Sequence, residues 1–301
     1  MSNRAETVIY DIVKAVRGVL REHEVTFEEY RKAVAFLMRY TKAPEFEIPL
    51  TCDVWFNATI SDIEMTRRKG SVTNLEGPYF LEGAPLIDDR IKTREGEGEP
   101  LIIEGAISDL QGLPIEGAEL HIWHSDPKGF YSGYEQNFPI NFYRGKKLIG
   151  PTGKYRIRTT VPSPYRIPHD GPTGEMLELM GRHPWRPAHV HFKIRADGFL
   201  EHTTQAYFAG SEWLNSDCVE GVRSPLTHQL KKRDGVNVLE KDFLLDRDQR
   251  ADRVRPMGDA ATSHANWLER IARVHARHED AKRNLSTTFV RRRSAEHGRA
   301  F

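Results

Sequence analysis

Residues 186–192 have the sequence Arg-Pro-Ala-His-Val-His-Phe, and this stretch gives the clearest indication of both fold and chemistry. In an extended strand, residues two apart point to the same face, so His189 and His191 can reach one metal ion. The apolar residues at 190, 192 and 194 then pack on the opposite face. This alternation predicts a strand that separates a buried core from a pair of imidazoles. A His-x-His pair alone, however, also occurs among ordinary surface or core histidines.

The middle of the chain, from Thr73 onward, has the pattern of short strands separated by turns. Apolar and polar residues alternate, and Gly and Pro stand between the runs. The expected strands cover residues 101–103, 118–122, 155–161, 188–194, 203–208 and 236–245. We predict a mainly β fold with an α-helical N-terminal region, in which an antiparallel β-sandwich covers residues 73–250. A helical region (1–72) precedes it, and a basic, partly helical extension (251–301) follows it.

The N-terminal region has the periodicity of two amphipathic helices. Apolar residues recur every three or four positions from Val8 to Leu20 and form one stripe. Thr26 followed by Glu29 predicts a capping box at the start of a second helix. Burial of each Val, Ile or Leu side chain is worth roughly 1.5 to 3 kcal/mol, so the stripe is too long to remain in water. We therefore expect it to form an interface.

Composition and charge are those of an ordinary soluble enzyme. The 301 residues include 44 Lys and Arg and 43 Asp and Glu, and a net charge of +1 gives no overall attraction to nucleic acid or a membrane surface. Two cysteines, Cys52 and Cys218, are too few for a disulfide framework and predict free thiols in a reducing compartment. The N-terminus has neither the apolar run of a signal peptide nor the length of a membrane span, so we expect a cytoplasmic protein.

The basic segment after residue 250 is expected to add one amphipathic helix, around Trp267 to His275, and a charged tail that contains residues 291–293 (Arg-Arg-Arg). We interpret this segment as a packing or oligomerisation appendage. A nucleic-acid role is the less favoured alternative, because a run of charges is usually a solvated surface.

Two tyrosines upstream of the histidines sharpen the interpretation. Tyr131 follows Gly129-Phe130, and Tyr165 ends the stretch 161–165 (Val-Pro-Ser-Pro-Tyr). With these phenols, the chain from about Leu50 to Leu226 resembles the intradiol ring-cleaving dioxygenases, the catechol 1,2-dioxygenase family. An ordered set of segments, far more specific than any single member, supports the resemblance: residues 75–80, 123–131, 181–183, 186–191 and 203–205.

The resemblance implies one iron(III) per chain, held by Tyr131, Tyr165, His189 and His191. It also implies that the enzyme uses O2 to open a small aromatic ortho-diol between its two hydroxylated carbons, giving a muconate-type diacid. Phenolate oxygen suits this hard ion, and a bound cation can keep a tyrosine ionised although its free pKa is about 10. Tyr165 would leave the metal to accept a substrate proton, whereas Tyr131 would stay. Finally, the N-terminal stripe would pair with a second copy of the chain, with room for a lipid in the helical groove.

Two further residues match the register of the family. Arg186 lies three positions before His189, and Gln205 lies sixteen positions after it. A guanidinium can stabilise negative charge that develops on the ring, and an amide can hydrogen-bond a ligand or an oxygen intermediate. The alternative interpretations are a surface ion pair for Arg186 and a plain strand residue for Gln205.

The substrate pocket is expected where the N-terminal region meets the sandwich, because outward-facing histidines need a cover. The N-terminal helices and the loops around residues 50–54 and 75–80 are the predicted cover. The resemblance places ten residues around the ring: Leu50, Asp53, Val54, Leu75, Gly77, Pro78, Phe80, Ile167, Pro168 and Val219. Residues 50–53 are more similar to the hydroxyquinol and chlorocatechol branches than to the plain catechol branch. Asp53 can accept a hydrogen bond from a third ring hydroxyl, which would favour hydroxyquinol and a maleylacetate product, or it can cap a helix over residues 54–60. The sequence leaves the substrate open.

Two other classes of function compete with this interpretation. An extradiol or zinc enzyme would combine the two histidines with a carboxylate such as Asp197 or Glu201, and both tyrosines would then have no role. A non-catalytic sandwich-type binding module would need no metal. Several neighbouring residues could be mistaken for ligands: we interpret His121, Trp123 and His124 as structural, Tyr155 as a core residue, and Tyr134 and Tyr143 as loop residues.

Overall fold

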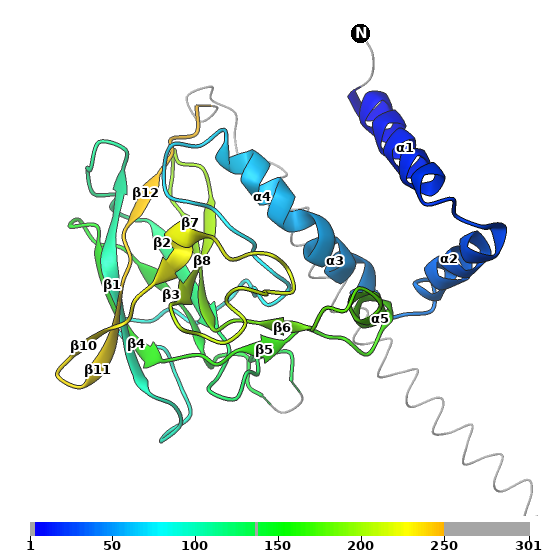
Figure 1. Cartoon of the computed structure of the whole chain (residues 1–301). Helices are drawn as coiled ribbons and strands as arrows, with labels where there is room; N and C mark the ends of the chain where they lie inside the picture. Colours follow the sequence, from blue (N-terminus) through cyan, green and yellow to red (C-terminus); the bar gives the residue numbers. More distant parts are fainter. Residues whose placement is uncertain (1–3, 136–137, 250–301) are drawn as a thin grey trace, which may run out of the picture.

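The computed structural model describes residues 4–135 and 138–249, and it confirms a mainly β fold with a helical N-terminal region (Figure 1). The strands of this part are β1 (Pro100–Asp109), β2 (Glu119–His124), β3 (Arg144–Leu148), β4 (Lys154–Thr160), β5 (Tyr165–Arg166), β6 (Trp185–Arg186), β7 (His189–Arg195), β8 (His202–Phe208), β9 (Thr227–His228), β10 (Lys231–Arg233), β11 (Val236–Glu240) and β12 (Phe243–Leu245). The helices are α1 (Arg4–Glu22), α2 (Phe27–Arg39), α3 (Glu47–Cys52), a π-helical turn η1 (Asp53–Asn57), α4 (Ala58–Met65), α5 (Pro172–Leu179) and a 3-10 turn η2 (Ser224–Leu226).

Two five-stranded sheets enclose the core of the sandwich. One contains β1, β4, β10, β11 and β12, and the other has the order β3-β2-β7-β8-β9. Apolar side chains from both sheets meet in one buried cluster that includes Val190, Phe192 and Ile194 of β7, each with no exposed surface. The predicted core side of this strand is therefore confirmed, and its histidines lie on the opposite face.

The sheets are mixed rather than purely antiparallel, which corrects the sequence-based expectation. β1 pairs antiparallel with β4 but parallel with β11 and β12, and β8 pairs parallel with β9. Parallel neighbours require a long crossover connection, which local alternation cannot reveal.

The predicted strand over residues 236–245 is in fact two strands, β11 and β12. Gly105 of β1 explains the break, because a Cβ at this position would lie 1.9 Å from the carbonyl oxygen of Lys241. The Asp242 side chain replaces a ladder hydrogen bond there, since its Oδ1 accepts from the amide of Ala106 at 2.8 Å. The regular ladder is therefore interrupted at Lys241 and Asp242, and pairing with β1 resumes at Phe243.

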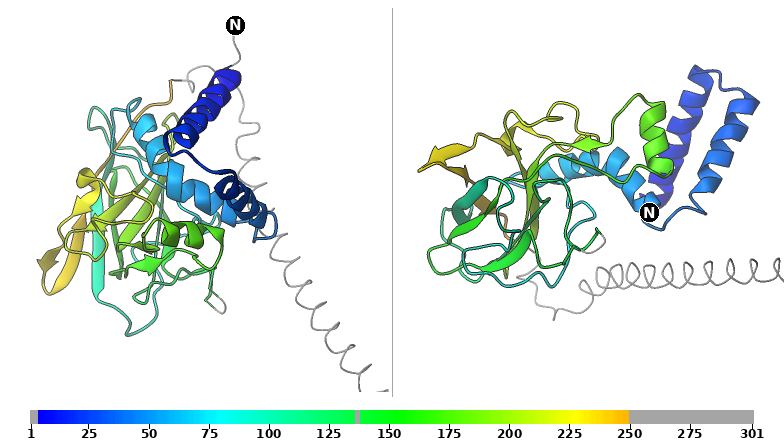
Figure 2. Two further views of the ribbon diagram at one scale, coloured as in Figure 1. Left: turned by 45° about the vertical axis from the view of Figure 1, so that its right-hand side comes forward. Right: turned by 90° about the horizontal axis from the view of Figure 1, so that it is seen from below.

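Helices α1 and α2 form as predicted and project from the sandwich (Figures 1 and 2). The capping box is present: Thr26 Oγ1 accepts from the Glu29 amide at 3.2 Å, and the Glu29 carboxylate accepts from the Thr26 amide at 2.8 Å. Neither helix has a buried residue. The apolar stripe is thus exposed in a single chain.

The segment around residues 50–54 is helical, so the predicted loop is wrong. α3, η1 and α4 run as one helix alongside the sandwich (Figure 1). Asp53 has helical backbone angles, and its carboxylate accepts from Asn57 Nδ2 at 2.8 Å. The interpretation of Asp53 as an N-cap is therefore wrong, because a cap residue needs extended backbone angles. The π-helical turn η1 begins at Asp53, and such turns are frequent at functional sites.

The predicted boundary at residues 72/73 falls in the irregular segment between α4 and β1. The C-terminal extension, with its expected helix and arginine run, lies outside the described residues. Within the described ranges, no helix has both the length and the apolar character needed to cross a membrane.

Candidate metal centre

The two histidines of β7 point into one buried space on the outer face of their sheet. Their side chains are 1% and 0% exposed, and His189 Nε2 lies 3.0 Å from His191 Nε2. His189 Nδ1 lies 2.7 Å from the Pro187 carbonyl oxygen. Because a carbonyl can only accept, this contact keeps the proton on Nδ1 and makes Nε2 the unprotonated nitrogen, with its lone pair directed into the site. The two Nε2 atoms are close enough together for one metal ion to be held between the two imidazoles.

Tyr131, from a loop, and Tyr165, at the start of β5, reach the same space. The rings of Tyr131 and Tyr165 have centroids 5.0 Å apart. Gly129, with φ +88°, allows this approach, because a Cβ there would lie 2.7 Å from the Pro164 carbonyl oxygen and 3.3 Å from Tyr165 Cβ. Asp126 shapes the turn, since its Oδ1 accepts from the amides of Lys128 and Phe130, each at 2.9 Å.

A stacked pair of rings fixes the orientation of Tyr131. Its ring lies 4.0 Å from that of Tyr79, with an interplanar angle of 6°. The buried Arg144 donates to the carbonyl oxygens of Tyr79 and Ser132 at 3.0 and 2.6 Å, and so ties the two loops together. Tyr79 and Arg144 were not identified as site residues from the sequence, although Tyr79 lies within the 75–80 segment.

Burial sets the protonation states of these four side chains. It lowers the pKa of His189 and of His191 well below the ordinary value, and the nearby Arg186 charge adds to this shift. Both imidazoles are therefore neutral, which is the form that binds a metal. Burial also raises the pKa of the Tyr131 and Tyr165 phenols. Neither phenol would ionise near neutral pH unless a strong positive charge lay beside it.

The donor set fits iron(III) and does not fit the zinc or extradiol alternative. Tyr131 Oη is buried and makes no hydrogen bond of normal length and angle to the described residues, which is costly unless another group satisfies it. Within the described part of the chain, no group of three or more His, Cys, Asp or Glu side chains is placed to hold a metal. Glu201 instead pairs with Lys193 and Arg195 at 2.9 and 2.8 Å, and Asp197 is exposed. Two imidazoles with two phenols suit a hard, highly charged ion.

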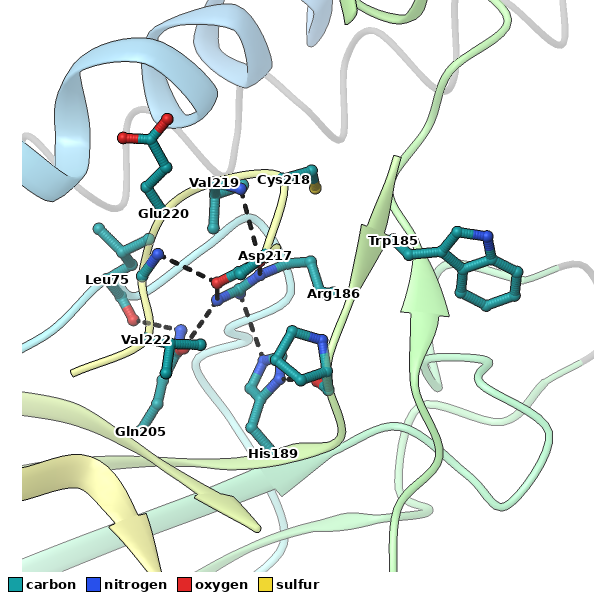
Figure 3. Close-up of polar contacts among 12 residues, drawn as sticks. Leu75, Trp185, Arg186, His189, Gln205, Asp217, Cys218, Val219, Glu220 and Val222 are labelled. Atoms are coloured by element: carbon teal, nitrogen blue, oxygen red, sulfur yellow. Dashed lines mark hydrogen bonds and ion pairs between the residues drawn. The ribbon is translucent and has the colours of Figure 1, made fainter. Parts of the chain in front are cut away.

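Arg186 and Gln205 lie beside the histidines, within one buried network (Figure 3). Arg186 Nη1 lies 3.3 Å from His189 Nε2 and 3.5 Å from Tyr165 Oη, while Nη2 donates to Gln205 Oε1 at 3.0 Å. Gln205 Nε2 donates to the Leu75 carbonyl oxygen at 2.8 Å and lies 3.3 Å from His191 Nδ1. The alternatives of a surface ion pair and a plain strand residue are therefore wrong, because both side chains are buried and contact the site.

A second apolar cluster forms the wall of the site. Leu50, Val54, Leu75, Phe80, Ile167 and Val219 are all buried in it, together with Tyr131, Tyr165, Trp123 and Cys218. Gly77, with φ +69°, lies against the site, since a Cβ there would be 3.7 Å from His191 Cε1. The Pro78 carbonyl oxygen accepts from the Tyr134 hydroxyl. Asp53 is partly buried, whereas Pro168, next to the buried Ile167, is exposed.

Most of the residues that could be mistaken for ligands have structural partners. Tyr155 is in the core and donates to the Lys241 carbonyl oxygen, and His124 Nε2 lies 2.8 Å from Thr159 Oγ1. His121 Nε2 lies 2.5 Å from Glu119 Oε1. Trp123 is closer to the site than the sequence suggested, because its ring stacks on that of His191 at 4.7 Å with an angle of 9°. It therefore orients a candidate ligand.

Comparison with known proteins covers most of the chain. A family model described as Dioxygenase matches residues 75–247, and one described as Catechol dioxygenase N terminus matches residues 2–71. Chlorocatechol 1,2-dioxygenase of Pseudomonas sp. (strain P51) is 45% identical over 248 residues, which are 82% of this chain and 98% of that protein. Hydroxyquinol 1,2-dioxygenase of Rhizobium sp. (strain MTP-10005) is 31% identical over 74% of this chain and 78% of that protein.

Solved structures agree with these matches. The crystal structure of chlorocatechol 1,2-dioxygenase from Pseudomonas putida has a TM-score of 0.78 at 44% identity, covering 82% of this chain and 100% of that chain. Because family models and close relatives align over both the helical region and the sandwich, the chain belongs to the intradiol ring-cleaving enzymes of the catechol dioxygenase family.

Proposed function

We propose that this enzyme holds one iron(III) per chain through Tyr131, Tyr165, His189 and His191, and that its preferred substrates are chlorinated catechols. The observation that carries the proposal is the convergence of two buried phenols and two neutral imidazoles, with Nε2 atoms 3.0 Å apart, in one space. Iron(III) bound there would supply the Lewis-acid and redox chemistry that activates a catecholate ring toward O2.

The side chains of the site have distinct roles in this proposal. Tyr165 is the base for one substrate hydroxyl proton, because Arg186 Nη1 lies 3.5 Å from its oxygen and stabilises the ionised phenol until the proton arrives. Once Tyr165 is neutral, the same guanidinium faces the negative charge that develops on the ring. Tyr131 keeps its position through its stack on Tyr79. Gln205 links Arg186 to the wall of the site, because its Oε1 accepts from Arg186 and its Nε2 donates to the Leu75 carbonyl oxygen.

The wall of the site favours apolar ring substituents. Leu50, Val54, Leu75, Phe80, Ile167 and Val219 present aliphatic or aromatic surface. A chlorine atom needs no hydrogen-bond partner there, whereas a third hydroxyl would be desolvated at a cost of about 1 to 3 kcal/mol. Chlorocatechol-cleaving relatives at 44 to 45% identity, against 31% for a hydroxyquinol-cleaving one, support the same preference. We keep Gly77, Pro78, Pro168 and Asp53 as pocket residues in this proposal.

Hydroxyquinol remains the second candidate substrate because of Asp53. Its carboxylate is partly buried and close enough to Arg186 and Glu76 for their charges to affect its pKa, which burial raises. A third ring hydroxyl could donate to this carboxylate.

Metal analysis and a substrate panel test the proposed function. We expect about one iron per chain, visible absorption from phenolate-to-iron charge transfer, and kcat/KM in the order chlorocatechol, catechol, hydroxyquinol. Products should be chloromuconate-type and muconate-type diacids. A yellow semialdehyde, or full activity in an iron-free and colourless protein, would overturn the assignment. A preference for hydroxyquinol with maleylacetate as product would overturn only the substrate.

We also propose a homodimer formed by the N-terminal helices, in which residues 1–72 serve as the dimerisation and cover region, 73–250 as the catalytic sandwich and 251–301 as an appendage. The α1 stripe supports this, since Ile9, Ile12, Val16 and Val19 are 52 to 62% exposed in one chain. Light scattering on Ile12→Glu should give a monomer, while the control Lys14→Glu, on the opposite face of α1, should stay dimeric. A monomeric wild-type protein at micromolar concentration would contradict the dimer. Solvent extraction followed by mass spectrometry would detect a lipid in the helical groove.

A further inference from the structure

Asp217 contacts Arg186 on the side away from the candidate metal centre, and no motif in the sequence singles it out. Its Oδ1 accepts from Arg186 Nε at 3.0 Å, and its Oδ2 accepts from Nη2 at 3.1 Å (Figure 3). The two side chains are only 3% and 2% exposed, so this is a buried, two-pronged ion pair. Geometry of this kind fixes the plane of a guanidinium as well as its position.

The remaining contacts of Arg186 show what this pairing achieves. Nη2 also donates to Gln205 Oε1 at 3.0 Å and to Tyr207 Oη at 2.9 Å. Nε and Nη2 are therefore turned away from the candidate metal centre. Nη1 faces it, at 3.3 Å from His189 Nε2 and 3.5 Å from Tyr165 Oη.

The same carboxylate also organises a wall of the pocket. Asp217 Oδ2 accepts from the Gly221 amide at 3.0 Å, and Oδ1 lies 3.4 Å from the Val219 amide. The loop from 217 to 221 thereby places Cys218 and Val219 in the apolar cluster beside Tyr131 and Tyr165. Figure 3 shows this loop closing over the guanidinium.

Charge gives Asp217 a second effect. A guanidinium 3.3 Å from the coordinating atom of His189 repels any cation that binds there. Among the described residues, Asp217 is the acid that forms an ion pair with Arg186. Removing one partner of a buried ion pair leaves a charge that the surroundings cannot solvate. Without Asp217, the site would combine an uncompensated arginine with a trivalent ion.

We propose that Asp217 is a positioning residue that acts through Arg186. It holds the guanidinium with Nη1 toward Tyr165 and His189, and it cancels the arginine charge so that the site retains a highly charged cation. This inference rests on the proposed iron site and extends it by a residue that does not touch the substrate.

The test uses the full-length, iron-loaded protein and Asp217→Asn, which keeps the shape and one acceptor but removes the charge. We expect iron retention against a competing chelator to fall about 10- to 100-fold, as for other groups that support metal ligands. The visible charge-transfer band should move, because the environment of Tyr165 changes, and kcat should fall more than KM rises. Asp217→Glu should recover part of the iron retention.

Arg182→Met is the matched control. Arg182 Nη2 donates to the Cys218 carbonyl oxygen at 3.0 Å, so it anchors the same loop without contacting Arg186. We expect this variant to keep the iron retention and band position of the wild type. If it loses iron as Asp217→Asn does, Asp217 is only a loop anchor and the proposal is overturned.

The double variant Arg186→Gln, Asp217→Asn removes both charges. It should retain iron better than Asp217→Asn alone, although its activity stays low. If the double variant retains iron no better than Asp217→Asn, the charge argument is overturned. If Asp217→Asn does not fold, Asp217→Glu takes its place as the single variant in this comparison. A wild-type protein that contains no iron would refute the proposed function. If the wild type and Asp217→Asn both contain iron and retain it equally well against the chelator, only this inference is refuted.

Discussion

Replacing Tyr131 by Phe should stabilise the metal-free protein and at the same time abolish iron binding at the proposed site. The substitution removes only the hydroxyl oxygen. That oxygen is buried and makes no hydrogen bond of normal length and angle to any described residue, although the neighbouring Tyr165 phenol is close enough to raise its pKa. The ring itself keeps its stack on Tyr79 at 4.0 Å and its place in the apolar wall.

The magnitude follows from these contacts. A buried polar group without a partner costs about 1 to 3 kcal/mol, and its removal without loss of packing recovers that amount. We therefore expect the free energy of unfolding of metal-free Tyr131→Phe to exceed that of the wild type by about 1 to 3 kcal/mol. Tyr155→Phe is the matched control, because Tyr155 is equally buried at 3% exposed but donates to the Lys241 carbonyl oxygen. It should be less stable than the wild type by about 1 to 2 kcal/mol and keep its colour.

Urea unfolding of the metal-free proteins, followed by repetition after iron loading, measures both effects. A metal that binds only the folded state raises its stability, so iron should stabilise the wild type and Tyr155→Phe but hardly change Tyr131→Phe. The order of stability of wild type and Tyr131→Phe should therefore reverse on loading. If metal-free Tyr131→Phe is destabilised as much as Tyr155→Phe, the Tyr131 hydroxyl has a structural partner. If Tyr131→Phe retains iron, colour and turnover, another phenol such as Tyr134 is the ligand.

Three further predictions concern residues around the site and the core. Burial lowers the pKa of His202 to about 3, so between about pH 6.5 and pH 3 only the unfolded state binds a proton at this residue, and the free energy of unfolding falls as the pH falls. At pH 5 this residue costs about 2 kcal/mol of stability, so between pH 7 and pH 5 His202→Leu should lose about 2 kcal/mol less than the wild type in urea unfolding. Equal losses in the two proteins would contradict the reasoning. Lys193 is buried and pairs with Glu201 and with Glu76, which stands between the proposed pocket residues Leu75 and Gly77. Lys193→Met should therefore raise KM and cost about 1 to 3 kcal/mol in thermal unfolding, against less than about 1 kcal/mol for the more exposed Arg195→Met. Equal effects of the two variants would show that the Glu76 pair has no special role. Asp53→Ala should lower kcat/KM for hydroxyquinol relative to chlorocatechol by about tenfold if the carboxylate faces the ring, and an unchanged ratio would place Asp53 outside the pocket.

The residue types and periodicities along the chain were enough to predict much of the fold. The His-x-His strand, the capping box at Thr26 and the apolar stripe of α1 depend on neighbours within a few positions, and each is present in the structure. The alternation of residues along β7 was also enough to distinguish its core face from the face that carries His189 and His191. The choice of Tyr131 and Tyr165 among ten tyrosines, however, came from family resemblance, since periodicity does not single them out.

Contacts between distant parts of the chain decided the rest. The phenols meet because Gly129 admits the Pro164–Tyr165 segment at a distance that no other residue type allows. The parallel partners of β1 and the break at Lys241 depend on where the returning chain meets Gly105. Asp217 reaches Arg186 across 31 positions of sequence, and this ion pair exists only once the loop has closed. Sequence thus determined which groups are available for chemistry, whereas tertiary packing decided which of them meet, because burial and charge pairing depend on neighbours that the chain order does not specify.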